Sequence, residues 1–545
     1  MARAGHSHRG RARHARRRAP RPRRAVAREL PGVPRHRHGA LLLGAVPFSA
    51  YATSPAAQLA PCMANARPPV LITESSPLGT AHELGALSPS IEHVVVLDGD
   101  GARGMNLDGL QGLCPDAFDA HESASQVGPE DLCSLVYTSG TTGAPKGVPY
   151  LHRCLMATTA PIHGHTPVSP GGRAISYRPI AHIAERVFGH YAAFAFGCEL
   201  TSLGDAARLG QALPTVRPTR FFGVPRLWEK LLAGVHRALG EQFAPEQTAA
   251  LHAAWQRSIA RVDAAQAGES PASELETTRE QDDSALAPLS AMLGLDAAEW
   301  LGVAGAPAGR DTLLALHALG LEVNELYGLS ETIIVSESPP ERVKIGAVGL
   351  PLPGVKVRLA GDGEILVGGV TVMPGYLDEP DRTAEVLVDG WMPSGDIGAF
   401  DEGAYLRITD RKEALIINSA GKDMSPAAIE QAIRGGHPLI GQVVATGDRR
   451  PYNVALIVLD PGGLEALRAT KGIEPAPRPR LAADPEVLAA VEQAVQEGNA
   501  KLSRVEQVKR CAVLDRVWQP AGAEPTPTGK LKRGPITDQI DELHR

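Results

Sequence analysis

The run Tyr137–Gly147 contains the residue types that bind phosphate groups. It reads Tyr-Thr-Ser-Gly-Thr-Thr-Gly-Ala-Pro-Lys-Gly. Its glycines let the backbone approach an anion closely, its Thr and Ser hydroxyls can donate hydrogen bonds, and its lysine adds a mobile positive charge. These features predict a loop that holds a polyphosphate. The candidate binding residues are Thr138, Ser139, Gly140, Thr141, Thr142, Gly143 and Lys146.

The apolar run Leu132–Tyr137 leads directly into this loop and predicts a buried strand. The loop should therefore leave the edge of a sheet, where nucleotides commonly bind. It is not a Walker A loop, because Lys146 is followed by glycine and not by Ser or Thr. Taken alone, the run could also be an ordinary turn rich in Gly and Thr.

A second run, Asn324–Thr332, places an aromatic ring, a glycine, hydroxyls and a carboxylate within one turn. Alone, it could be a strand end with a capping glutamate. Other segments carry single groups that also have ordinary explanations. His182 could be a core histidine, and Lys530 could be a solvated lysine in a polar tail. Asp396 and Arg411 could each belong to a surface ion pair.

Together these segments resemble the AMP-forming adenylating superfamily of acyl-CoA synthetases, acyl adenylases and luciferases. The resemblance extends from about Gly39 to Arg533 and is closest to the long-chain fatty acyl-CoA synthetases. It implies that Tyr327 lies against adenine, that Ser330 faces the α-phosphate and that Glu331 holds Mg²⁺. The same family pattern adds further nucleotide-binding residues: Gly305, Ala306, Pro307, Gly328 and Thr332.

The resemblance also implies roles for residues outside this turn. Asp396 would grip the ribose hydroxyls, with Arg411 as the second ribose contact. His182 would stand at the wall of the acyl site, near the substrate carboxylate. Lys530 would be the catalytic lysine, an ammonium on a flexible stem that is delivered only for the reaction. Gly421 would lie beside the channel for the pantetheine arm of coenzyme A.

The reaction implied by this resemblance has two halves. A medium- to long-chain fatty acid attacks the α-phosphate of Mg²⁺-bound ATP, giving an acyl-adenylate and pyrophosphate. The thiol of coenzyme A then takes the acyl group and releases AMP. Ser330 and Ser394 stand where the family usually has Thr, and Ala420 where it favours glycine, but every catalytic group is kept. Two alternatives stay open: an acyl adenylase with another acceptor, and a degenerate non-catalytic protein that binds nucleotide or nucleic acid.

The composition is that of an ordinary globular protein of two or three domains, with 545 residues, 43% hydrophobic and 21% charged. Six scattered cysteines indicate neither a disulfide framework nor a structural metal, which favours a cytoplasmic location. The first 40 residues carry +12 (thirteen Arg, one Glu), so the rest carries −18 of the net −6. That acidic body argues against nucleic-acid binding by the folded part. Membrane-surface association and oligomeric state stay open.

The sequence also predicts how the chain is divided. Residues 1–38 are expected to be disordered or aberrant, because their Arg-, Ala-, Pro- and His-rich composition cannot bury a core. Residues 39–410 should form an α/β AMP-binding domain with doubly wound sheets, shortened in its first part, with a helical insertion at about 240–295. Residues 411–545 should form a small, mobile α+β domain that carries the catalytic lysine.

Individual elements can be predicted as well. Strands are expected at 70–73, 91–97, 363–367 and 404–408. In the C-terminal unit, Ser425 should cap a helix that runs to about Arg434 and stops at Gly435. The remaining expectations there are a hairpin pairing 443–445 with 453–458, a loop at 474–480 and a helix at 484–499.

Overall fold

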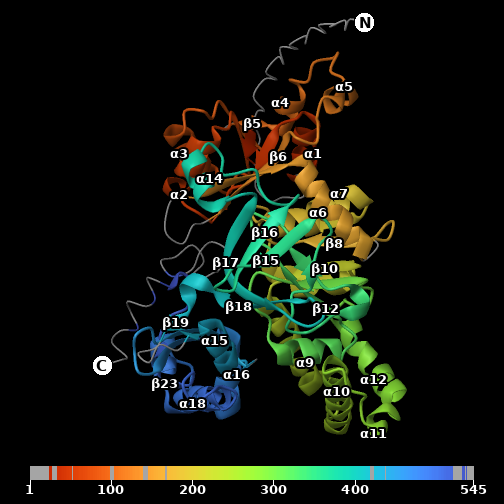
Figure 1. The fold of residues 1–545 in the computed structure, drawn as a ribbon, viewed down its shortest axis with the longest axis vertical. Helices are drawn as coiled ribbons and strands as arrows, with labels where there is room; N and C mark the ends of the chain where they lie inside the picture. The colour runs from red at the N-terminus through yellow and green to blue at the C-terminus, as the bar shows by residue number, and fades with distance from the viewer. Residues whose placement is uncertain are drawn as a thin grey trace, which may run out of the picture.

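The computed structural model forms a large N-terminal α/β domain and a smaller C-terminal domain of strands and helices (Figure 1). It describes residues 24–26, 33–51, 53–98, 104–138, 145–165, 168–417, 423–435, 437–518, 524, 531–533, 536 and 540. The fold class expected from the sequence is confirmed.

The first sheet has the strand order β5-β4-β3-β1-β2-β6-β7. Its strands are β1 (Arg24–Val26), β2 (Val46–Phe48), β3 (Val70–Thr73), β4 (His93–Val96), β5 (Met105–Asn106), β6 (Leu132–Thr138) and β7 (Lys146–Leu151). Its neighbouring strands are parallel, except that β6 and β7 are antiparallel. The chain therefore reverses direction at the phosphate-rich run. The helices of this part are α1 (Val33–Leu42), α2 (Ala56–Ala66), α3 (Leu78–Leu87), α4 (Leu107–Gln111), α5 (Ala120–Ser125) and α6 (His152–His165).

The second sheet begins with three parallel strands, β10 (Arg220–Gly223), β11 (Trp300–Val303) and β12 (Val323–Tyr327). Two short antiparallel strands extend it, β13 (Ser336–Glu337) and β14 (Leu350–Pro351). A separate parallel pair lies beside it, β8 (Arg173–Ser176) and β9 (Glu199–Ser202). The short helices here are the π-helix η1 (Glu185–Tyr191), α7 (Ala192–Phe196), η2 (Ala206–Arg208), α8 (Leu209–Val216), α13 (Arg310–His317) and η3 (Pro340–Arg342).

Between β10 and β11 the chain is helical, with α9 (Pro225–Gln242), α10 (Pro245–Gln266), α11 (Ser273–Glu276) and α12 (Arg279–Met292). These helices contribute to the core as well as to the surface. The Trp255 side chain is 1% exposed, and its indole N–H donates to the Ala315 carbonyl at 2.9 Å. Arg261 and Asp282 form a buried ion pair of 2.9 Å between α10 and α12. Some polar residues of this segment therefore pair with each other between its helices instead of facing solvent.

The third sheet is antiparallel and contains β15 (Val355–Leu359), β16 (Glu364–Gly369), β17 (Trp391–Phe400) and β18 (Leu406–Arg411). Helix α14 (Pro380–Val386) lies between β16 and β17 in the chain. The sheet ends at Arg411, where the short turn η4 (Lys412–Ala414) leads towards the C-terminal domain.

The C-terminal domain is built on a three-stranded sheet of β21 (Ile440–Thr446), β22 (Asn453–Leu459) and β23 (Val508–Leu514). A small pair, β19 (Ile416–Ile417) and β20 (Asp423–Met424), precedes it. One face of the sheet packs against helical residues from α15 (Pro426–Arg434), α16 (Pro461–Lys471), α17 (Arg478–Ala482) and α18 (Pro485–Ala500). On the other face the sheet residues cluster with Trp518, Ile536 and Ile540.

The start of this domain follows its sequence signals. The Ser425 hydroxyl accepts the backbone N–H of Ala428 and caps α15, and Gly435 ends the helix with φ +44°. The hairpin of β21 and β22 forms in the expected place. The expectation of a loop throughout 474–480 is wrong at its end, because α17 begins at Arg478, with Pro479 in its first turn.

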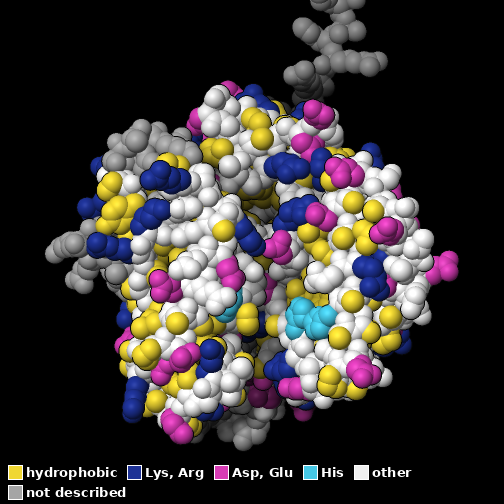
Figure 2. Space-filling model, turned by 90° about the horizontal axis from the view of Figure 1, so that it is seen from below, with side chains coloured by type: hydrophobic (Ala, Val, Ile, Leu, Met, Phe, Trp, Pro, Cys, Tyr) yellow, Lys and Arg dark blue, Asp and Glu magenta, His cyan; other side chains and the backbone are white. Residues whose placement is uncertain are grey.

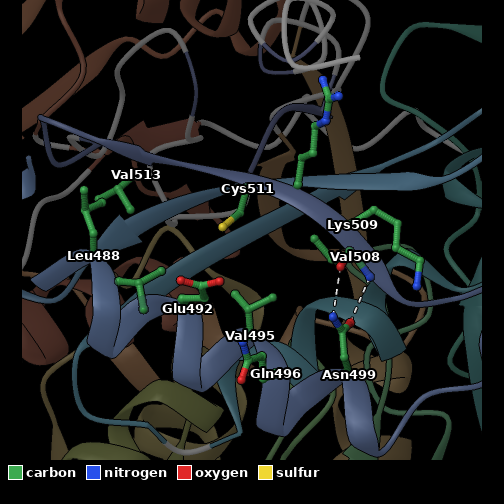
Figure 3. Close-up of a pocket in the computed structure, with 11 residues that line it drawn as sticks. Leu488, Glu492, Val495, Gln496, Asn499, Val508, Lys509, Cys511 and Val513 are labelled. Atoms are coloured by element: carbon green, nitrogen blue, oxygen red, sulfur yellow. Dashed lines mark hydrogen bonds between the residues drawn. The ribbon is translucent and has the colours of Figure 1, made fainter. Parts of the chain in front are cut away.

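A pocket of about 460 Å³ lies between α18 and β23 (Figure 3). Apolar side chains such as Val491 and Val495 line it together with the Cys511 thiol. At one end Asn499 hydrogen-bonds both backbone groups of Val508 at 2.9 Å, which ties the helix to the strand. Of the residues expected to carry the chemistry, none that the structure describes lines this pocket.

Polar side chains link the two domains. The Gln431 side chain donates to the Ala308 carbonyl at 2.7 Å, and Glu229 pairs with Arg434 at 3.1 Å. Further pairs join Arg226 to Asp460 and Lys501 to Asp311. Seen from below, the surface is hollowed between two lobes, with charged side chains of both signs around the hollow (Figure 2). Within the described residues, no helix combines the length and apolar character needed to span a bilayer.

Candidate functional site

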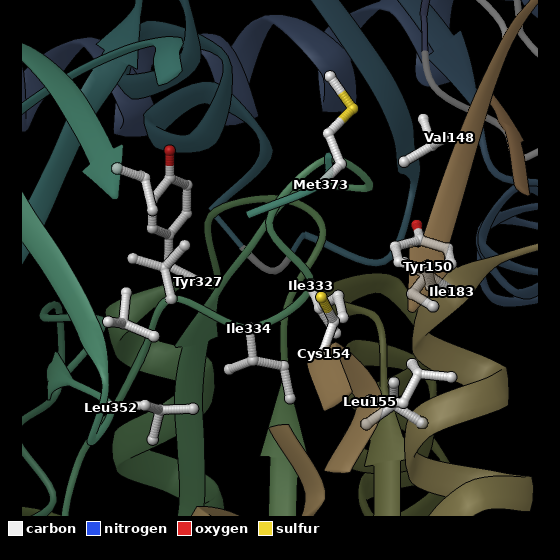
Figure 4. Packing of buried hydrophobic residues seen from close by; sticks show 14 of the residues in the cluster. Val148, Tyr150, Cys154, Leu155, Ile183, Tyr327, Ile333, Ile334, Leu352 and Met373 are labelled. Atoms are coloured by element: carbon white, nitrogen blue, oxygen red, sulfur yellow. The ribbon is translucent and has the colours of Figure 1, made fainter. Parts of the chain in front are cut away.

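A buried apolar cluster supports the edge where the first two sheets meet the third. It includes Val148 and Tyr150 from β7, Ile183 next to η1, and Tyr327 at the end of β12 (Figure 4). Met373, after β16, belongs to the same cluster. Segments far apart in the sequence therefore share one rigid base, and the polar groups that follow them are held at fixed positions.

The phosphate-rich run starts and ends in this region. Thr138 is the last residue of β6 and pairs with Lys146, the first residue of β7. Both side chains are half-buried. The other expected members of the loop, Ser139, Gly140, Thr141, Thr142 and Gly143, lie outside the described residues.

Lys146 and Glu331 meet at the side chain of Tyr376. The Lys146 ammonium lies 5.0 Å from the centre of the Tyr376 ring. The Tyr376 hydroxyl donates to the Glu331 Oε1 atom at 3.0 Å. The phosphate-rich run and the turn after β12 thus open onto one site. Burial and the nearby Glu331 charge raise the pKa of Tyr376 above its ordinary value, so the hydroxyl keeps its proton.

The segment 373–377 joins these two parts of the site through its backbone. The Met373 N–H donates to the Glu331 carbonyl at 2.8 Å, and the Leu377 N–H donates to the Gly147 carbonyl at 2.9 Å. Sequence reasoning did not single out Tyr376. The only signal available was the pair Gly375-Tyr376, and such pairs occur in many ordinary turns.

Tyr327, Asp396 and Arg411 also converge. The Tyr327 hydroxyl donates to Asp396 Oδ2 at 2.6 Å, and Arg411 Nε lies 2.8 Å from Asp396 Oδ1. Strand pairing sets Asp396 opposite Arg411 on β17 and β18. Asp396 is 4% exposed, whereas half of the Arg411 side chain is exposed. Burial and the Asp396 charge raise the pKa of Tyr327.

The turn after β12 is tightly closed. A Cβ at Gly328 would lie 1.9 Å from the Ile333 carbonyl oxygen, so only glycine fits. The Thr332 hydroxyl accepts the Leu329 N–H at 3.3 Å, and the Ser330 carbonyl accepts the Tyr150 hydroxyl at 2.5 Å. Ile333 has φ +62°, a costly conformation for a β-branched residue. The surrounding packing therefore imposes the shape of this turn.

Gly305, Ala306 and Pro307 follow one residue after the end of β11 and are exposed. Because β11 and β12 are parallel neighbours, this segment and the turn after Tyr327 leave the same edge of the sheet. Gly305 has φ +91°, which favours glycine.

His182 precedes the π-helix η1 and is half-buried, and its Nδ1 atom accepts the Ala184 N–H at 3.2 Å. The neighbouring Arg186 is fully buried and donates to the Ile180 carbonyl, the Ser134 hydroxyl and the Leu135 carbonyl. Arg186 thereby fixes η1 against β6. Lys530 and Gly421 lie outside the described residues.

Comparison with known proteins identifies the class of protein that has this fold and site. Residues 36–377 match the AMP-binding enzyme family, and residues 413–542 match the AMP-binding enzyme C-terminal domain. The chain belongs to the AMP-binding enzyme family, and the resemblance expected from its motifs is confirmed.

Two curated relatives carry more specific names. The putative fatty-acid–CoA ligase fadD11 of Mycobacterium tuberculosis is 42% identical over 438 residues, covering 79% of this chain and 76% of that protein. The long-chain-fatty-acid–CoA ligase FadD15 of Mycobacterium bovis is 31% identical over 507 residues, covering 92% and 83%.

Solved structures share the fold at low sequence identity. The adenylation domain of a carboxylate reductase from Mycobacterium chelonae gives a TM-score of 0.73 at 19% identity, covering 96% of this chain and 80% of that one. The anthranilate CoA ligase AuaEII, in complex with anthranoyl-AMP, gives 0.70 at 17% identity, covering 96% and 88%. These matches support the fold.

Proposed function

We propose that this chain is an AMP-forming fatty-acid–CoA ligase. It activates a medium- to long-chain fatty acid with ATP to an acyl-adenylate, and then transfers the acyl group to coenzyme A with release of AMP. Its relatives are named for this activity. The observation that carries the proposal is that the turn after β12 joins two groups of side chains. Its end at Glu331 meets Tyr376, whose ring faces Lys146. At its start, Tyr327 contacts Asp396.

The two ends of the turn suit the two ends of ATP. Asp396 is fixed by Tyr327 and Arg411, and the remaining lone pairs of its carboxylate can accept the ribose hydroxyls. Four residues after Tyr327, Glu331 accepts from the hydroxyl of Tyr376, whose ring faces Lys146, and the triphosphate would extend to this place. The α-phosphate would then lie between the residues that bind the ribose and those that bind the phosphates, and catalysis would come mainly from placement and electrostatics.

Magnesium fits the residues at this place. Mg²⁺ is usually bound by one or two carboxylates together with substrate phosphates and water. Among the described residues, no group of three or more His, Cys, Asp or Glu side chains could hold a metal ion by itself. Glu331 would therefore hold Mg²⁺ jointly with the phosphate oxygens of ATP. The ion would neutralise charge on the leaving pyrophosphate.

The direct test is to measure AMP formation by the purified chain with ATP, Mg²⁺ and a series of fatty acids of increasing length, with and without coenzyme A. We expect AMP formation that depends on both a fatty acid and coenzyme A. Pyrophosphate release at an equal rate without coenzyme A would favour an acyl adenylase with another acceptor. No ATP consumption with any fatty acid would contradict the proposal.

A further inference from the structure

Tyr376 is the one described side chain seen to contact both Lys146 and Glu331. Its ring face is turned to the ammonium at 5.0 Å, and its hydroxyl donates to the carboxylate at 3.0 Å. The two charged groups therefore take their relative position from a third residue.

The backbone around Tyr376 leaves it little freedom. Gly375 has φ +134°, and a Cβ there would lie 2.6 Å from a methyl group of Thr383. The Tyr376 N–H donates to the Thr383 hydroxyl at 2.9 Å, so α14 fixes the residue from outside the site. Hydrogen bonds from Met373 and Leu377 fix the segment on either side. The aromatic ring is thus held by the fold before any nucleotide binds.

The two contacts act on different parts of a triphosphate site. A hydroxyl that donates to one carboxylate oxygen orients the group and leaves the other oxygen for a cation. An aromatic face attracts an ammonium through its quadrupole. Together the contacts keep Lys146 and Glu331 close to each other without requiring a direct ion pair, which a phosphate and a cation would have to break.

We propose that Tyr376 is a positioning residue that sets the Glu331 carboxylate for Mg²⁺ and the Lys146 ammonium for the phosphates of the same ATP. This inference rests on the proposed function.

Two substitutions separate the two contacts. Tyr376→Phe keeps the ring under Lys146 and removes the hydrogen bond to Glu331. Tyr376→Leu removes both. Tyr405 offers a matched control, because its hydroxyl donates to the Arg342 carbonyl at 2.8 Å and the Lys344 ammonium lies 5.5 Å from its ring. The variants Tyr405→Phe and Tyr405→Leu therefore lose the same kinds of contact elsewhere in the fold.

The measurement is the binding of ATP to the full-length chain by calorimetry, in EDTA and over a series of Mg²⁺ concentrations, without fatty acid. For Tyr376→Phe we expect ATP binding in EDTA to stay unchanged and the Mg²⁺ concentration needed for tight binding to rise about tenfold or more. For Tyr376→Leu we expect weaker ATP binding in EDTA as well. Both Tyr405 variants should keep the wild-type Mg²⁺ dependence.

The outcomes separate this inference from the proposed function. A wild-type chain that binds no ATP under any condition would overturn both. If the wild type binds ATP and folded Tyr376→Phe shows the same Mg²⁺ dependence, only the role of Tyr376 is wrong. Thermal unfolding of each variant shows whether it is folded. Should Tyr376→Leu fail to fold, the phenylalanine variant still decides the question.

Discussion

Asp396 is the side chain at which three separate parts of the chain meet. It receives a hydrogen bond from the end of β12 and an ion pair from the end of β18, while its own backbone belongs to β17. A buried carboxylate is costly unless it is paired, and here both oxygens have a partner. The carboxylate is therefore held in one orientation before a ligand arrives.

We expect Asp396→Asn to raise the KM for ATP by about ten- to a hundredfold with a smaller change in kcat, because it removes the carboxylate proposed to accept the ribose hydroxyls. The measurement is ATP–pyrophosphate exchange with ATP and with 2′-deoxy-ATP. The wild type should discriminate between the two nucleotides, and the variant should do so much less. Equal discrimination by both proteins would contradict a ribose contact at Asp396.

Among single residues, the sequence predicted those that belong to a recognisable motif. It missed Tyr376, which belongs to none. Tyr327, Asp396 and Arg411 were singled out through resemblance, and the structure brings them together. Tyr376 could not be found in this way, because its importance comes from two contacts with residues 230 and 45 positions away. Such contacts depend on tertiary packing and leave no local pattern.

Among the structural elements, β11 and β13 are joined by a buried polar contact behind the site. The Trp300 indole N–H donates to Glu337 Oε1 at 2.6 Å, and Arg220 lies over the Trp300 ring. Burial raises the pKa of Glu337 from 4.5 to about 7, against the lowering effects of Trp300 and Arg220. The folded protein therefore holds a proton here that the unfolded chain releases at lower pH.

This predicts a pH-dependent difference between the wild type and Glu337→Gln. Because the pKa of Glu337 is higher in the folded protein than in the unfolded chain, the wild type loses stability as the pH rises from about 4.5 to about 7. Glutamine does not titrate, so the variant does not undergo this loss. The free energy of unfolding of the variant minus that of the wild type should increase by roughly 1–3 kcal/mol over this range. Urea unfolding between about pH 5 and pH 8 measures it. The exposed Glu341→Gln is the control, and a constant difference for Glu337→Gln would contradict the prediction.

Element boundaries were predictable where end signals are strong and local. Ser425 and Gly435 are such signals, and α15 lies between them as expected. The π-helix η1 could not be predicted, because apolar spacing does not reveal which hydrogen-bond pattern a buried helix adopts. Its geometry is set instead by buried contacts such as those of Arg186 with β6.

At the scale of the molecule, the contacts that join the C-terminal domain to the rest are polar, and no apolar cluster among the described residues spans both domains. Glu229 is 9% exposed and accepts from both Arg226 and Arg434, each at 3.1 Å. The exposed Lys501–Asp311 pair is weak and screened by salt, whereas the contacts of the nearly buried Glu229 are screened much less and hold the interface more firmly. The sequence predicted two domains, but not which residues join them.

We expect Arg434→Ala to loosen this arrangement, because it removes a domain-linking charge next to a nearly buried carboxylate. Small-angle X-ray scattering should show a larger radius of gyration for this variant than for the wild type. Arg449→Ala is the control, since this side chain is 92% exposed in the same domain. An unchanged radius for Arg434→Ala would show that other contacts hold the domains together.

The chain reverses direction between β6 and β7, and this has a consequence for product release from the proposed nucleotide site. Where a phosphate loop runs into a helix, the helix dipole adds a fixed attraction for the anion. Here the chain turns back into a strand at Lys146, so among the described residues the positive charge at the end of the loop comes from the Lys146 side chain and not from a helix dipole. Under the proposed function, this side chain would be the part of the phosphate site that yields when pyrophosphate leaves, while Tyr376 sets its resting position. The arrangement suits repeated turnover better than long retention of the nucleotide.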